Sequence, residues 1–443
     1  MKEGTDNLEK IRQILSSKDL LKKIGYVLFA LFIFRVAAHV PIPGPDAENV
    51  RNFLSQSFAS NSVLSFLDLF SGGGISRFSV VLMGVGPYIT ASIMIQLLTL
   101  VFPRLEAISK EGEQGQKKLN QYSRLIALPL AYIEGYAAIR FLQFSTSQAG
   151  QDLIGTPTIA QWALMLTSIA AGTMFLMWLG ELITEKGLGN GISIIIFAGI
   201  VAGLPQYIGE AIQKIFIPEF DSTQLIRYGV IAAAALLVIL AIIVVTEGQR
   251  KIPISYAKRM RGAKLYGGID SFLPIKLNMA GVIPIIFAGA FMNIPVMIGF
   301  LASARTQWIA RSADWVKTTF AQQTISYAVM YFVLVFAFTF FSTFLYFKPK
   351  DVAENIQKQG GFIPGIRPGT QTEKYLNWLI NRTTLWGAIF LAVIAAMPFM
   401  IDKFAKTGNL VIGGTSLLIV VGVALEIRNQ IDAQIITRSY DSI

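Results

Sequence analysis

The sequence has no cysteine, one histidine and few charged residues, and each shortage removes a class of function. Without cysteine there is neither a disulfide framework nor thiolate chemistry. The single histidine, His39, excludes every metal site that needs two imidazoles. The sequence also lacks the GxxxxGK[ST] phosphate loop and the GxSxG and HExxH motifs. We therefore predict a protein that is not an enzyme and that uses no cofactor.

Long apolar segments dominate what is present. Of 443 residues, 53% are hydrophobic and 15% are charged, and the mean hydropathy is +0.55, which predicts a membrane protein. A helix needs about 20 mostly apolar residues to cross a bilayer. Ten segments approach this length: residues 22–41, 78–102, 122–142, 158–182, 190–208, 225–246, 274–301, 325–347, 378–400 and 410–427. A cleavable signal peptide is a weaker interpretation of the first segment, which contains Arg35 and leads into VPIPGPD.

The basic residues predict the orientation of these spans. Ten spans place both termini on the same side of the membrane. The termini and the loops on their side carry 27 Lys and Arg residues, whereas the opposite loops carry 10. Because such an excess marks the cytoplasmic side, we expect both termini to be cytoplasmic. The net charge of +11 is thus explained largely by orientation and does not by itself indicate nucleic acid.

Two spans contain amides and interrupted backbone. Gln96 lies in 78–102 and Asn278 lies in 274–301, each among glycines and prolines. Such residues are tolerated at membrane depth when they face protein or a water-filled cavity, although an amide can also simply bond a neighbouring helix. Most spans have no ionisable residue near the centre, which argues against an ion-coupled transporter. We predict a polytopic protein with a polar interior path.

Two cytoplasmic loops have unusual composition. Loop 247–276 is densely basic and loop 348–382 contains a Gly/Pro-rich turn sequence around Arg367. The positive-inside rule alone would explain both loops. A projecting basic patch could alternatively meet RNA phosphates or an acidic protein surface. The basic residues of the first loop are Arg250, Lys251, Lys258, Arg259, Arg261 and Lys264.

Three consecutive glycines, Gly72, Gly73 and Gly74, precede the second span in the stretch FLDLFSGGGISRFS. A phosphate-binding loop is excluded because the lysine is missing and because the stretch falls on the outer side. The apolar residues near 63–73 are too few to cross a membrane. We interpret the glycines as a loose joint between this short segment and the second span.

Several long motifs resemble the SecY/Sec61-alpha family of protein-conducting channel subunits, and their sequences are most similar to those of bacterial members. They are FSGGGISRFSVVLMGVGPYITASIMIQLL, GTMFLMWLGELITEKGLGNGISIIIFAGIVAGLP, NMAGVIPIIFA, GGFIPGIRPGTQTEKYL and GGTSLLIVVGVALE. The resemblance implies an all-α polytopic membrane protein with ten transmembrane helices in two inverted five-helix halves around an hourglass pore. It implies a cytoplasmic segment 1–21, halves 22–215 and 216–427, and a cytoplasmic tail 428–443. It also implies a short plug helix near 63–73.

The resemblance further implies the residues of a channel. An apolar collar that resists water and ions without selecting among side chains would suit the passage of many polypeptides. The implied collar consists of Val85, Ile89, Ile192, Ile196, Ile286 and Ile419, and the implied plug and hinge consist of Leu64, Phe66, Leu67, Leu69, Phe70, Gly72, Gly73 and Gly74. Membrane segments would leave into lipid between helices 2 and 7. There Gln96 and Asn278 are expected to hold the gate shut by hydrogen bonds, so that leucine at either position relaxes signal-sequence stringency.

The implied partners are SecE-like and SecG-like membrane subunits, the SecA motor ATPase, the ribosome, signal-bearing polypeptides and membrane lipid. Arg367 matches a motor-sensitive arginine, and loop 247–276 matches the segment used by motor and ribosome. No sequence-specific nucleic acid is expected. The implied location is the bacterial plasma membrane. The alternatives are an ion-coupled small-solute transporter, and an insertase or scaffold that passes no chain across.

Overall fold

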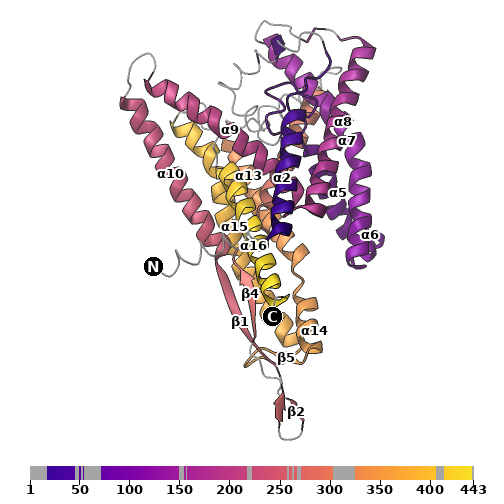
Figure 1. The fold of residues 1–443 in the computed structure, drawn as a ribbon, viewed down its shortest axis with the longest axis vertical. Coiled ribbons are helices and arrows are strands. Elements are labelled where there is room, and N and C mark those ends of the chain that lie inside the picture. Colours follow the sequence, from indigo (N-terminus) through magenta and orange to yellow (C-terminus); the bar gives the residue numbers. More distant parts are fainter. Residues whose placement is uncertain are drawn as a thin grey trace.

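The computed structural model describes most of the chain. The described residues are 17–44, 49–50, 53, 71–148, 154–155, 157–216, 222–256, 259–261, 264–266, 271–302, 325–405 and 414–441. Within these ranges helices predominate, and most of them run side by side along the long axis of the molecule (Figure 1).

Each predicted span coincides with a helix. These helices are α2 (Lys18–Ala37), α5 (Gly86–Val101), α7 (Glu113–Gln148), α8 (Ile159–Lys186), α9 (Gly191–Phe216), α10 (Ser222–Glu247), α11 (Ile283–Ala302), α13 (Ile325–Tyr346), α15 (Thr370–Ala405) and α16 (Gly414–Asp441). By length and composition, 5 helices of the described part could cross a membrane, or 6 if α5 and α6 (Pro103–Ser109), bent by 109°, form one span. The multi-pass prediction is confirmed.

Two spans begin later than predicted. The segment 78–85 forms turns, and α5 starts at Gly86 with Pro87 in its first turn, where the missing N–H of proline costs no hydrogen bond. Residues 274–276 belong to a strand, and α11 starts at Ile283. Hydropathy could not show this, because apolar backbone that is not helical is also tolerated when protein surrounds it.

The loops on one side contain strands that the all-α prediction omitted. β1 (Gln249–Tyr256) pairs with β4 (Ser271–Lys276) and, at its other end, with β5 (Gly361–Phe362), giving the antiparallel order β4-β1-β5. β2 (Arg259–Arg261) and β3 (Lys264–Tyr266) form a second hairpin. The helix α14 (Pro349–Lys358) packs on α15 beside β5. The sheets, α6 and α14 lie at one end of the molecule (Figure 1).

The largest apolar core is built by buried residues of α2, α5, α8, α9, α11, α13, α15 and α16. α5 packs against α7 and α11, and α9 packs against α8 and α16. α10 differs from the others, because only 6% of its apolar window is buried within the chain. Its exposed Leu237 and Val244 are therefore suited to lipid rather than to the core.

Glycines allow the closest contacts between helices and backbone. A Cβ on Gly172 of α8 would lie 2.1 Å from the carbonyl oxygen of Val80. A Cβ on Gly191, the first residue of α9, would lie 1.9 Å from the carbonyl oxygen of Gly180 on α8. Since both obstacles are backbone atoms, no side-chain rotation can relieve the overlap. Small residues here set the distance between neighbouring elements.

We predict that Gly172→Ala lowers the thermal unfolding midpoint of the purified protein in detergent. The added methyl group must displace the 78–82 segment from α8, and overpacking of this kind costs about 1–3 kcal/mol. The matched control is Gly209→Ala on α9, where a Cβ would meet no atom within 4 Å. Equal midpoints for the two variants would contradict the prediction.

Candidate functional site

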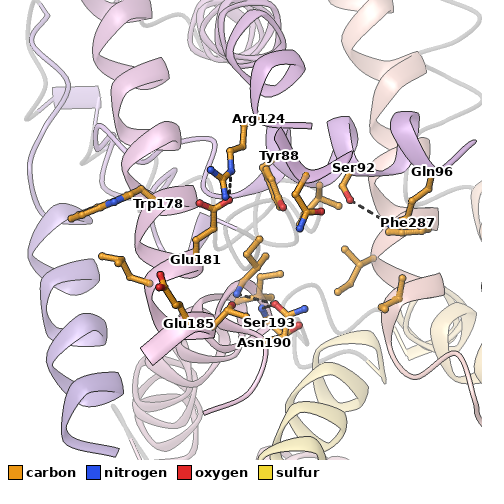
Figure 2. Close-up of a pocket in the computed structure, with 18 of the residues that line it drawn as sticks. Tyr88, Ser92, Gln96, Arg124, Trp178, Glu181, Glu185, Asn190, Ser193 and Phe287 are labelled. Carbon is orange, nitrogen blue, oxygen red and sulfur yellow. Dashed lines mark hydrogen bonds and ion pairs between the residues drawn. The ribbon is translucent and has the colours of Figure 1, made fainter. Parts of the chain in front are cut away.

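A cavity of 690 Å³ opens between α5, α7, α8, α9 and α11. Figure 2 shows polar and charged side chains along its walls, with Tyr88, Ser92 and Gln96 contributed by α5. The lining residues are Tyr88, Ile89, Ser92, Gln96, Lys117, Asn120, Arg124, Trp178, Glu181, Leu182, Thr184, Glu185, Asn190, Ile192, Ser193, Ile196, Ile283, Ile286 and Phe287. It thus brings together five helices from distant parts of the sequence.

The cavity reaches the predicted collar. Ile89 on α5, Ile192 and Ile196 on α9, and Ile286 on α11 all line it. The other two members, Val85 at the N-cap of α5 and Ile419 on α16, do not line it. All six nevertheless belong to, or pack against, one apolar cluster, in which Val85 is fully buried. The structure therefore gathers the six predicted residues, from four helices, around one region.

Charged groups occupy other parts of the cavity wall. Arg124 Nε on α7 lies 2.5 Å from Glu181 Oε1 on α8, and both side chains are half-buried. Lys117, one of the lining residues, forms an exposed ion pair with Glu113 at 2.9 Å. Sequence reasoning counted Arg124 only as an orienting charge. The spacing from Lys117 to Arg124, two helical turns on one face, was the available signal.

The predicted amide pair is wrong. Gln96 Nε2 donates to Ser92 Oγ, 3.4 Å away on the same helix, and Asn278 Nδ2 donates to the Gly281 carbonyl at 3.1 Å. Asn278 does not lie on helix 7 but in the turn before α11, where its backbone approaches Gly387 of α15. Among the described residues no hydrogen bond joins the two amides, and both amide oxygens are buried without a partner.

The glycine turn is packed rather than loose. Gly72 and Gly73 have φ of 68° and 86°, values that favour glycine, and a Cβ on Gly72 would lie 2.3 Å from Phe34 Cζ on α2. Arg35, inside the first span, donates to the Gly72 carbonyl at 3.2 Å. Arg77 donates to the Gly73 carbonyl at 3.3 Å. These contacts fix the turn against α2, which corrects the prediction of a slack joint.

The remaining plug residues lie outside the described part of the chain. They are Leu64, Phe66, Leu67, Leu69 and Phe70. The description resumes at Ser71, whose buried Oγ accepts from the backbone N–H groups of Gly74 and Ile75 at 3.0 and 3.2 Å. A fixed turn therefore leads directly from the predicted plug segment to α5.

The two cytoplasmic loops of the prediction form one platform, which we define as β1, β4, β5 and α14. Ser255 and Tyr256 of loop 247–276 pair with Phe362 and Gly361 of loop 348–382. Ile252, Ile275 and Ile363 share a buried cluster with Leu376 and Leu379 of α15. Sequence reasoning treated the loops separately, since strand pairing between distant segments leaves no local signal.

The predicted contact residues are distributed over this platform and its tip. Arg250 and Lys251 lie exposed on β1, and Arg367 is exposed in the turn after β5, where its carbonyl accepts from Thr372 Oγ1 at 3.0 Å. Arg259, Arg261 and Lys264 lie on the β2–β3 hairpin. Lys258 falls outside the described residues. The pairing of β1 with β5 thus joins the strand that carries Arg250 to the loop that carries Arg367.

Comparison with known proteins identifies the family. The SecY family model matches residues 79–428. The chain belongs to the SecY family. The protein translocase subunit SecY of Thermotoga maritima is 42% identical over 428 residues, which is 96% of this chain and 94% of that protein. The SecY of Streptomyces coelicolor is 37% identical and covers 98% of this chain and 99% of its own.

Solved structures share the SecY fold at low sequence identity. A protein-conducting channel has a TM-score of 0.60 and 17% identity and covers 94% of this chain and 93% of its own. A SecY structure described by a plug domain that stabilises the closed state has a TM-score of 0.60, 16% identity and the same coverages. The yeast Ssh1 complex bound to the 80S ribosome has a TM-score of 0.62, 18% identity and coverages of 94% and 90%. The predicted fold class, a helical membrane protein of the SecY type, is confirmed.

Because the side-chain oxygen of Gln96 has no hydrogen-bond partner, we now expect leucine at this position to tighten signal-sequence stringency rather than relax it. A buried acceptor without a donor costs about 1–3 kcal/mol in the arrangement in which α5 packs against α11. We predict that Gln96→Leu removes this cost, stabilises the closed gate, and slows vesicle export of preproteins with weak signal sequences. Gln371→Leu, at an exposed amide of α15, is the control. Faster export through Gln96→Leu would show the prediction to be wrong.

Proposed function

We propose that the chain is the channel-forming subunit of a protein translocase. It passes unfolded secretory polypeptides across the bacterial plasma membrane and releases membrane segments laterally between α5 and α11. The observation that carries this is the cavity of 690 Å³ that ends on isoleucines from α5, α9 and α11. An apolar collar dewets and resists ions, and it offers no fixed hydrogen-bond pattern that would select one side chain over another.

A small-solute transporter fits the same cavity less well. Such a protein needs a few polar groups that converge on one solute, and a carboxylate for the coupling ion near the middle of the membrane. Glu134 on α7 is the buried carboxyl group nearest to that description, but it lies against Gly86 of α5 and does not line the cavity. The polar groups that do line it are spread over five helices.

The platform supports proposals about partners. Its exposed Arg250 and Lys251 on β1, and Arg367 in the turn after β5, offer cationic side chains that suit an acidic face of a motor ATPase or ribosomal RNA. We assign the motor and ribosome contacts of the chain to this platform. SecE-like and SecG-like subunits would pack on the membrane-facing helices. The proposed organisation also includes two halves, 22–215 and 216–427, a plug near 63–73, and cytoplasmic termini.

A cysteine at the collar tests the channel directly, because the native chain has none. We predict that Ile196→Cys forms a disulfide with a single-cysteine preprotein stalled during transport in vesicles. The residue is 1% exposed and lines the cavity, so only a chain inside the pore can reach it. Val244→Cys on α10, 71% exposed toward lipid, is the control. Transport without an adduct at position 196 would place the path elsewhere.

Charge reversal tests the platform. We predict that Arg367→Glu blocks ATP-dependent export by the motor in vesicles, because the reversal repels an acidic partner at the centre of its contact. Lys350→Glu, an exposed charge on α14 of the same platform but outside the turn that carries Arg367, should reduce export much less. The measurement is the protease-protected fraction of a preprotein. Equal losses in both variants would refute a specific role for Arg367.

A further inference from the structure

Two short rows of opposite charge line the cavity wall. Lys117 and Arg124 stand on α7, seven residues apart, and Glu181 and Glu185 stand on α8, four residues apart. Those spacings place each pair on one face of its helix. All four residues line the same cavity, and their formal charges cancel, while Lys117 also pairs with Glu113, which does not line it. Figure 2 shows Arg124 and Glu181 facing one another across the wall, with Glu185 below them.

The central ion pair, Arg124 with Glu181, is partly buried. Arg124 and Glu181 are 43% and 26% exposed, and their atoms approach to 2.5 Å. Tyr88 on α5, a buried side chain, lines the same cavity. Partial burial weakens the screening by water, so an unbalanced charge here would act on a passing chain more strongly than a charge on the open surface.

We propose that this balance keeps the cavity indifferent to the charge of a translocating segment, and that Arg124 and Glu181 are the residues that maintain it. The inference rests on the proposed channel function and adds a substrate property to it. When Arg124 is lost, Glu181 and Glu185 attract basic segments and repel acidic ones. When Glu181 is lost, Lys117 and Arg124 do the reverse.

The experiment uses preproteins that differ only in one short mature stretch, which is lysine-rich, aspartate-rich or serine-rich. Vesicles that contain the complete translocase carry wild type, Arg124→Gln, Glu181→Gln or the double variant. We measure the rate for the basic preprotein divided by the rate for the acidic one. This ratio should rise about threefold in Arg124→Gln, fall about threefold in Glu181→Gln, and return to the wild-type value in the double variant. Added salt should shrink both shifts.

Lys118→Gln is the matched control. Lys118 neighbours Lys117 on α7 but pairs with Glu111 and does not line the cavity, so its loss should leave the ratio unchanged. If Arg124→Gln does not fold, two exposed positions replace it in the test. Lys117→Gln should raise the ratio and Glu185→Gln should lower it.

The contrary results are distinct. If both variants slow all three preproteins equally, the ion pair only joins α7 to α8, and the inference is wrong although the channel function stands. The same conclusion follows if the ratio shifts in the same direction in both variants. If the wild-type vesicles export no preprotein at all, the proposed function itself fails, and this inference fails with it.

Discussion

Hydrocarbon offers no hydrogen bonds to a polypeptide backbone, and the rest of this structure depends on that constraint. Within the membrane each N–H and C=O that faces lipid must bond inside the protein, so the spans are helices, and irregular backbone is tolerated only against protein or a water-filled cavity. The cavity wall accordingly consists of residues from five helices. At the predicted collar, the helices contribute isoleucine and valine to one apolar cluster.

The same constraint governs the irregular segment before α5. Residues 78–85 are not helical, yet their backbone groups are bonded: Val80 N–H donates to the Val40 carbonyl and Ser79 N–H to the Gly74 carbonyl, both at 2.9 Å. Ile42 N–H donates to the Phe78 carbonyl at 2.9 Å. Gly172 permits α8 to lie directly on this segment. The apolar irregular backbone is thus stable because protein surrounds it, and it places Val85 at the collar.

In the loops outside the helices, water removes the constraint and strands appear. The β1–β5 pairing ties loop 247–276 to loop 348–382, and apolar residues under the sheet anchor both to α15. A partner that binds the basic strand therefore binds a body that is continuous with α15, and through it with α13 and α16. This continuity gives a physical route from the platform to the helices of the pore.

The sequence by itself determined the membrane class, the positions of ten apolar segments that each overlap a helix, and the position of Arg367 in an ordered turn. Long apolar runs, glycines and basic loops are local signals, and the SecY-like motifs carried the collar residues. Only the tertiary structure decided that 78–85 is irregular, that Gln96 and Asn278 do not bond, that the glycine turn is clamped by Phe34 and Arg35, and that Arg124 pairs with Glu181. Each of these depends on which distant residue lies opposite, and no local pattern of hydropathy or charge encodes that distance.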